Sequence, residues 1–204
     1  MIKETAKSAS ILMLRWTKKA LALPKPVALL VLVTALSAGA ATLAVPAQAD
    51  DFSSVHSLWH TDLCLDVQYN NQNNRTPVWL YHCNGTMAQD WRFISLGQNG
   101  SGFERFMLMD RAGYCLDAPA QYHNQAGHGV QIWWCNGGST QIWDKISNGP
   151  CWFCSEKFSL WNEYNHLTLD DAGWGGQGTP AITYYSHTQY HNDAVGTNQL
   201  WYRG

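Results

Sequence analysis

Three aspartates recur along this chain at nearly equal intervals, and each is followed by an aromatic side chain. The pairs are Asp66 with Tyr81, Asp117 with Trp133, and Asp170 with Tyr184. A carboxylate can accept hydrogen bonds from two neighbouring hydroxyl groups, and such charge-assisted bonds are about twice as strong as neutral ones. An aromatic face matches the apolar C–H face of a pyranose ring. These residue types therefore suit a ligand that is rich in hydroxyl groups.

A second motif, Gln-x-Trp, closes each copy of this pattern. Its copies are Gln89-Asp90-Trp91, Gln141-Ile142-Trp143 and Gln199-Leu200-Trp201. The three aspartates are 51 and 53 residues apart, and the closing glutamines are 52 and 58 residues apart. Self-similarity at such a period predicts a repeat architecture, here with three units.

The closing tryptophans and glutamines are expected to be structural. Trp91, Trp143 and Trp201 hold the same register in each copy and can each bury a large apolar area, which predicts a place in the core. A glutamine two residues before such a tryptophan lies on the same side of a strand, if one continues there. A buried glutamine needs a hydrogen-bond partner, and the recurring aspartate is the expected acceptor.

Short alternating apolar segments, bounded by Gly, Asn and Asp, recur after residue 50 and indicate strands. In one of them Val130 and Ile132 point to one face, while Gln131 and Trp133 point to the other. Three units with about four strands each predict a closed, twelve-stranded, all-β arrangement with pseudo-threefold symmetry.

All six cysteines lie after residue 50, and an even count in an exported chain favours disulfides. Cys64 and Cys83 hold the same two positions as Cys115 and Cys135, while the third copy has Thr168 and Ser186 there. Losing both members together is expected of a bonded pair, because a single orphan thiol invites mispairing. The repeats therefore predict pairs 64–83 and 115–135, which leaves Cys151 and Cys154 for each other.

The first quarter of the chain differs in kind from the rest. Six basic residues precede an apolar run over 27–45, and Ala47-Gln48-Ala49 has the small-residue pattern of a signal-peptidase site. This predicts a cleaved signal peptide over 1–49. A retained signal anchor is the alternative, because nineteen apolar residues can just span a bilayer.

The remaining residues, 50–204, are of single-domain size and acidic. They contain seven basic and fourteen acidic residues, a net charge of −7. A domain this acidic, with no basic stripe, is a poor candidate for contacts with phosphate backbones. We expect no nucleic-acid partner, and no membrane contact after signal cleavage.

The three Gln-x-Trp motifs, each preceded by a Leu-Asp segment and two of them accompanied by matching cysteine pairs, resemble those of the ricin B-type lectin family. The resemblance covers about 58–204. It implies a β-trefoil domain over 50–204, with three pseudo-symmetric repeats at about 55–102, 103–154 and 155–204. It also implies a secreted, non-enzymatic sugar-binding protein that needs no cofactor and has one shallow pocket per repeat.

The family's sugar-binding positions can be transferred to this sequence residue by residue. The resemblance implies Asp117, Gln131, Trp133 and Gln141 in the second repeat, Asp170, Tyr184, Asn198 and Gln199 in the third, and Asp66, Tyr81 and Gln89 in the first.

The chain departs from the family's pattern at several auxiliary positions. Thr140 stands where an Asn or His is usual in the second repeat, and Ile182 stands where a polar residue is usual in the third. In the first repeat Trp79 and Ala88 occupy both auxiliary polar positions, which ranks that pocket below the other two. Galactose-type and xylan-type glycans are both possible ligands.

Other functions are weighed against sugar binding. A β-trefoil can instead serve as a protein-interaction or inhibitor module with decayed pockets. A glycoside hydrolase would need two carboxyl groups within about 10 Å of each other, whereas the three aspartates are expected in separate pockets. The Cys151-Trp152-Phe153-Cys154 segment has redox-motif spacing but lacks the strand-to-helix context, and His187 with His191 lacks a third metal ligand.

Overall fold

The computed structural model describes residues 51–172, 175–186 and 197–204. The predicted signal segment, His187 and His191 lie outside these ranges. Within them the chain forms fourteen strands and five one-turn 3-10 helices, and no helix is long and apolar enough to cross a membrane. The strands are β1 (Phe52–Ser53), β2 (Val55–Ser57), β3 (Leu63–Val67), β4 (Val78–His82), β5 (Trp91–Gln98), β6 (Glu104–Asp110), β7 (Tyr114–Asp117), β8 (His128–Gly129), β9 (Gln131–Trp134), β10 (Trp143–Ser147), β11 (Phe158–Asn162), β12 (Thr168–Asp170), β13 (Ile182–Tyr184) and β14 (Trp201–Arg203). The 3-10 helices are η1 (Gln68–Asn70), η2 (Met87–Gln89), η3 (Ala120–Tyr122), η4 (Ser139–Gln141) and η5 (Thr197–Gln199).

Six strands close into a barrel if β1 and β2 are counted as one. The antiparallel pairs β5–β6, β6–β10, β10–β11, β11–β14 and β14–β2 follow one another around it. The ring closes because β1 and β2 form one N-terminal segment, interrupted at Ser54, and β1 pairs with β5. Closure leaves the barrel without free sheet edges.

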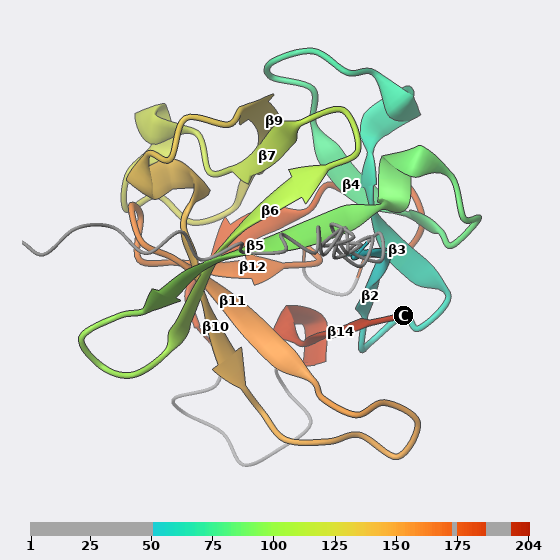
Figure 1. Cartoon of the computed structure of the whole chain (residues 1–204). Coiled ribbons are helices and arrows are strands. Elements are labelled where there is room, and N and C mark those ends of the chain that lie inside the picture. The colour runs from blue at the N-terminus through green and yellow to red at the C-terminus, as the bar shows by residue number, and fades with distance from the viewer. Residues whose placement is uncertain (1–50, 173–174, 187–196) are drawn as a thin grey trace, which may run out of the picture. The chain divides into compact units, whose positions relative to one another are not determined.

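Three hairpins, β3–β4, β7–β9 and β12–β13, complete the fold. In Figure 1 the β7–β9 and β3–β4 hairpins lie on different sides of the barrel. A closed ring of backbone hydrogen bonds joins all three repeats: Val78 N to Val130 O, Val130 N to Ala181 O, and Ala181 N to Val78 O, at 2.9–3.1 Å. The predicted all-β, pseudo-threefold trefoil architecture is confirmed, with the short strands β1 and β8 added to the expected pattern.

The three closing tryptophans are fully buried, as predicted. Their indole N–H groups donate to the backbone oxygens of Leu65, Leu116 and Leu169, at 2.9, 3.1 and 3.2 Å. The preceding glutamines are also buried, but they do not lie on the strands as expected. Each is the last residue of a 3-10 helix, and the strand begins at the tryptophan.

All three predicted disulfides are present, joining Cys64 to Cys83, Cys115 to Cys135, and Cys151 to Cys154. The first two join facing strands at equivalent places in their repeats. In the third repeat Thr168 is opposite Tyr184 in the β12–β13 ladder without such a bridge.

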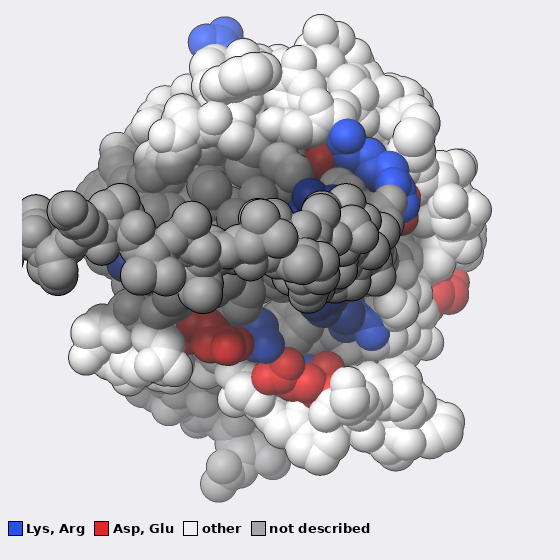
Figure 2. All heavy atoms as spheres, viewed as in Figure 1, with Lys and Arg blue, Asp and Glu red and all other residues white. Residues whose placement is uncertain are grey.

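Charged side chains of both signs are interspersed on the visible part of the face in Figure 2. Several are paired, as in Arg105 with Glu163 and Arg111 with Asp90. Pairing of this kind on an exposed surface contributes little to stability, at most about 1 kcal/mol per pair. The apolar core, which includes the three buried tryptophans, and the disulfides are therefore expected to contribute more to the stability of the domain than these ion pairs do.

Replacing a core tryptophan is expected to destabilise the domain strongly. Trp143→Ala removes a fully buried indole and leaves the Leu116 carbonyl without its donor, so the free energy of unfolding should fall by about 3–5 kcal/mol. Trp152→Ala is the control, because Trp152 is 92% exposed, and its effect should stay within about 0.5 kcal/mol. Chemical denaturation followed by far-UV circular dichroism measures both. Equal effects of the two substitutions would contradict the assigned core.

Removing the second disulfide is expected to destabilise the protein through the unfolded state. In the chain-entropy model, Cys115→Ser with Cys135→Ser frees a loop of about 20 residues and lowers the free energy of unfolding by about 3 kcal/mol. The same pair of changes should leave the native circular dichroism spectrum unaltered. Unchanged stability after removal of the pair would show that this bridge does not constrain the unfolded chain.

Candidate functional site

The register of the hairpins puts an aspartate and an aromatic residue on the same face in each repeat. Along the second strand of each hairpin, buried residues alternate with outward-facing ones. Directly across the ladder, Asp66 is opposite Trp79, Asp117 opposite Gln131, and Asp170 opposite Ile182. Because strand side chains alternate, the aromatic residue two positions further on lies on that same face. The outward-facing aromatics are Tyr81, Trp133 and Tyr184.

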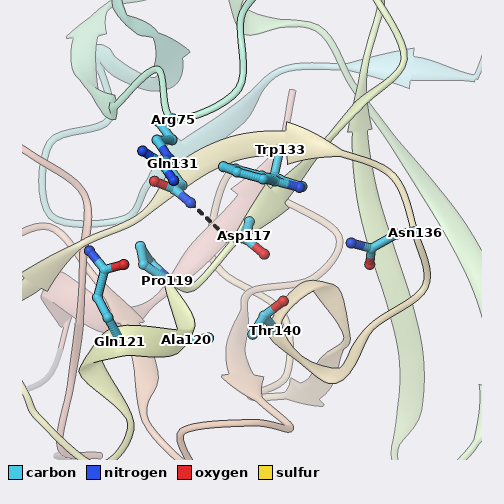
Figure 3. A pocket seen from close by; sticks show the side chains of 9 residues that line it. All are labelled: Arg75, Asp117, Pro119, Ala120, Gln121, Gln131, Trp133, Asn136 and Thr140. Atoms are coloured by element: carbon cyan, nitrogen blue, oxygen red, sulfur yellow. Dashed lines mark hydrogen bonds between the residues drawn. The ribbon is translucent and has the colours of Figure 1, made fainter.

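The second repeat holds an open pocket of about 350 Å³ (Figure 3). Its lining residues are Arg75, Asp117, Pro119, Ala120, Gln121, Gln131, Trp133, Asn136 and Thr140. The side-chain amide of Gln131 donates to Asp117 Oδ2 at 2.9 Å. Among the described residues this is the one side chain that donates to Asp117, so the other carboxylate oxygen is available to a ligand. The structure thus brings together Asp117, Gln131 and Trp133 as predicted.

Gln141 does not support Asp117, contrary to the expectation. Its amide nitrogen donates to the Trp134 backbone oxygen at 3.0 Å, and its amide oxygen accepts from the Asn136 N–H at 2.9 Å. Gln141 therefore fixes the loop between β9 and η4, while Gln131 takes over the hydrogen bond to the aspartate.

In the first repeat, the expectation that Trp79 deprives the pocket of a polar group is wrong. The indole N–H of Trp79 donates to Asp66 Oδ1 at 2.7 Å, and Gln89 donates to Asp66 Oδ2 at 2.9 Å. An indole N–H thus occupies the place that the Gln131 amide holds in the second repeat. The rings of Trp79 and Tyr81 are stacked, with centroids 5.5 Å apart.

The first-repeat pocket also measures about 350 Å³. It is lined by Asp66, Tyr69, Asn70, Trp79, Tyr81, Asn84, Thr86 and Ala88. Tyr69 is 80% exposed. Its ring packs against the Trp79 ring in an edge-to-face arrangement, with the ring centroids 5.0 Å apart. This pocket is therefore more aromatic than that of the second repeat.

In the third repeat, Asp170 is held by residues of η5. Asn198 and Gln199 donate to Asp170 Oδ2 at 2.9 and 2.8 Å. Ile182, which lies opposite Asp170 on β13, has no side-chain donor. Asn198 of η5 donates to Asp170 in its place, beside Gln199. Tyr184 is 37% exposed on the same face of β13. Asn198 and Gln199 thus hold the Asp170 carboxylate, and Tyr184 lies two residues after Ile182, which faces Asp170 across the ladder.

Burial raises the pKa of the Asp66 carboxyl above its ordinary value of 3.8. Hydrogen bonds from Trp79 and Gln89 oppose this shift, because they stabilise the charged form. The Asp66 carboxyl therefore takes up a proton at a higher pH than an exposed aspartate does.

Several lining residues were missed from the sequence. Asn84 and Asn136 follow the second cysteine of the first and second disulfides, and the recurring Cys-Asn-Gly segment could have identified them. Arg75 has no such signal, because it belongs to the first repeat but lines the pocket of the second.

Each pocket can bind a polyhydroxylated ligand, but its residues do not form a pair of acids. Asp66 is the one carboxylate that lines the first pocket, and Asp117 the one that lines the second. Among the described residues, His56, Cys64 and Cys83 form the one cluster with metal-ligand atoms close together. Its two sulfurs are joined in a disulfide, so it offers no thiolate to a metal.

Solved structures similar to this one are β-trefoil proteins or contain a matching region. The designed threefold-symmetric protein ThreeFoil aligns with a TM-score of 0.59 and 21% identity, over 76% of this chain and 98% of its own. An exo-beta-1,3-galactanase from Clostridium thermocellum aligns with a TM-score of 0.59 and 19% identity, over 76% of this chain and 30% of its own. The agglutinin from Abrus precatorius aligns with a TM-score of 0.51 and 20% identity, over 75% of this chain and 48% of its own. At these identities the likeness demonstrates a shared fold.

Comparison with curated proteins gave no match. The sequence profile of the ricin-type beta-trefoil lectin domain matches residues 51–150, which contain the first two Gln-x-Trp motifs and the first two pockets. This match assigns residues 51–150 to the ricin-type β-trefoil lectin family.

Proposed function

We propose that this protein is a secreted lectin that binds sugars without cleaving them, in shallow pockets on its three repeats. In each pocket the aspartate accepts hydrogen bonds from two ring hydroxyls, and the aromatic side chain stacks against the apolar face of the sugar. The observation that carries the proposal is the recurrence of this pair, with a donor that orients the carboxylate, in all three repeats.

The way in which each carboxylate is held supports a role in binding. An aspartate that only capped a turn would accept hydrogen bonds from nearby backbone N–H groups. Asp66, Asp117 and Asp170 instead accept from side chains on other strands or helices. These donors fix the carboxylate beside the aromatic ring, with the orientation that a ligand requires before it binds.

The pocket linings favour binding over hydrolysis. Glycoside hydrolysis requires an acid and a second carboxylate, about 5–10 Å apart. The described pockets of the first and second repeats each contain one aspartate and no glutamate. A single carboxylate can hold a sugar but has no partner with which to protonate or displace the leaving group.

Multivalency follows from the placement of the pockets on separate hairpins. Each pocket is open and small, so binding at one site should be weak. Several sites that engage one polymer or surface can raise the overall affinity by about 100- to 10,000-fold. We therefore propose that the physiological ligand is a repeating or densely displayed glycan, and that galactose-type and xylan-type chains are the first to test.

Neutralising the aspartates tests this proposal. A glycan array should identify a ligand for the wild-type protein, and calorimetry should then show that Asp117→Asn weakens binding by about 10- to 100-fold per occupied site, because charge-assisted hydrogen bonds are lost. Asp66→Asn and Asp170→Asn should each reduce the number of sites.

The matched control is Asp51→Asn, because Asp51 is exposed and pairs with Arg203 outside both described pockets. Unaltered glycan binding by a folded triple variant, with all three aspartates changed, would refute the assignment of the binding sites to these aspartates. Failure of the wild-type protein to bind any glycan would refute the lectin proposal and favour a protein-interaction module. Release of reducing sugar from a bound glycan would instead indicate a hydrolase.

The raised pKa of Asp66 predicts an acid-sensitive first pocket. In a protein with Asp117→Asn and Asp170→Asn, residual binding depends on Asp66, whose protonated form accepts hydrogen bonds less well. Because burial raises its pKa, affinity should fall as the pH is lowered from 7, with a midpoint above 3.8. Calorimetric titrations at successive pH values measure this midpoint, and affinity that stays constant down to pH 3.8 would argue against Asp66 as the acceptor.

A further inference from the structure

Three equivalent loop positions, one from each repeat, lie against the hairpin of the next repeat. The backbone N–H groups of Arg75, Gly127 and Gly178 donate to the oxygens of Ile132, Thr183 and Leu80, at 2.9, 2.8 and 2.7 Å. Their φ angles are 72°, 87° and 82°. The same left-handed backbone turn therefore occurs three times, with glycine at two positions and arginine at the third.

Glycine is the residue that this conformation favours. A left-handed φ costs a residue with a Cβ roughly 1 kcal/mol or more, whereas glycine adopts it freely. Non-glycine residues held in this region are often found at ligand clamps. The arginine is therefore not required by the turn, and its side chain is the feature that distinguishes this loop from the other two.

The loop holds Arg75 in a fixed place beside the second-repeat pocket. The Thr76 oxygen accepts from the Ile132 N–H at 2.9 Å, and Asn74 Oδ1 accepts from the Trp134 N–H at 2.7 Å. Arg75 thus lies between two residues that are bonded to β9, the strand that carries Trp133. In Figure 3 Arg75 enters the pocket region from above, near Gln131.

The guanidinium group of Arg75 lies over the aromatic platform. Its central carbon is 5.4 Å from the centroid of the Trp133 ring, within the distance of a cation–π contact, which is about 6 Å. A sugar that stacks on Trp133 would therefore lie next to a cation.

Arg75 also differs from other arginines of the domain in its partners. Arg105, Arg111 and Arg203 each pair with a carboxylate. Arg75 is exposed and has no ion-pair partner in the parts of the chain that the structure describes. Its five N–H donors are thus available, and their planar fork matches the geometry of a carboxylate.

We propose that the second-repeat pocket binds an acidic sugar residue, whose carboxylate pairs with Arg75 while its ring hydroxyls bond to Asp117. This inference rests on the proposed lectin function and specifies the ligand class of one pocket. The net charge of −7 does not oppose it, because charges further away than about 8 Å are largely screened at physiological ionic strength. At the positions equivalent to Arg75 in the other two loops, Gly127 and Gly178 carry no charged side chain.

Pairs of sugars that differ only in charge test the proposal. The probes are oligogalacturonides and oligoglucuronides, each beside its methyl ester, which retains the ring and removes the negative charge. Sulfated galactose is added to distinguish a carboxylate from another anion. Binding to the protein, with Asp66→Asn and Asp170→Asn to silence the other pockets, is measured by calorimetry.

The wild-type second pocket should bind at least one of the two acids about tenfold more tightly than its ester, the effect expected of one charge-assisted contact. Arg75→Gly should reduce this ratio to about one, and the glycines at the two equivalent positions indicate that the turn accepts this change. Arg75→Lys should give an intermediate ratio, because it keeps the charge but loses the fork. Arg203→Gly is the control and should leave the ratio unchanged.

Equal binding of acid and ester, together with loss of both in Asp117→Asn, would overturn the acidic-sugar proposal and leave the lectin proposal intact. Preference for sulfated galactose over both carboxylated sugars would also overturn it. If no probe binds but a neutral glycan does, the acidic-sugar proposal fails alone. If no glycan binds at all, both proposals fail.

Discussion

The hydrogen bond from each buried indole to the carbonyl of a leucine connects the core of this protein to its proposed binding surface. Leu65, Leu116 and Leu169 immediately precede Asp66, Asp117 and Asp170. The core tryptophan therefore fixes the peptide from which the aspartate projects. Since a buried donor or acceptor that loses its partner costs about 1–3 kcal/mol, the position of each aspartate is tied to the stability of the whole domain.

Around this fixed aspartate the three repeats use different donors for the same purpose. The first uses an indole and a glutamine, the second a glutamine from the facing strand, and the third an asparagine and a glutamine from a 3-10 helix. Each carboxylate is held by at least one side-chain N–H donor while its surroundings change. This explains how one fold can present pockets of different character, such as the aromatic first pocket and the second pocket with its cation.

The sequence predicted the structural features that recur from one repeat to the next. The tryptophan core, the strand alternation around Trp133 and two of the disulfides follow from residues that recur at fixed spacing, and the structure contains them. The third disulfide, also present, was predicted because Cys151 and Cys154 remained once the other two pairs were assigned. The donor assignments were less successful. Trp79 was treated as apolar because residue type alone does not reveal the direction of its N–H group, and Gln141 was assigned to Asp117 although a nearby backbone carbonyl competes for its amide.

The sequence by itself determined that one unit is repeated three times and that an acid and an aromatic residue recur in each. Both depend on local periodicity and on the burial of large apolar side chains, which can be read along the chain. Only the tertiary structure decided which residues complete each pocket. The loop of one repeat bonds to the hairpin of the next, as Arg75 does beside Trp133. Contacts between residues about 60 positions apart arise from closure of the barrel around its axis, and no spacing within a single repeat encodes them.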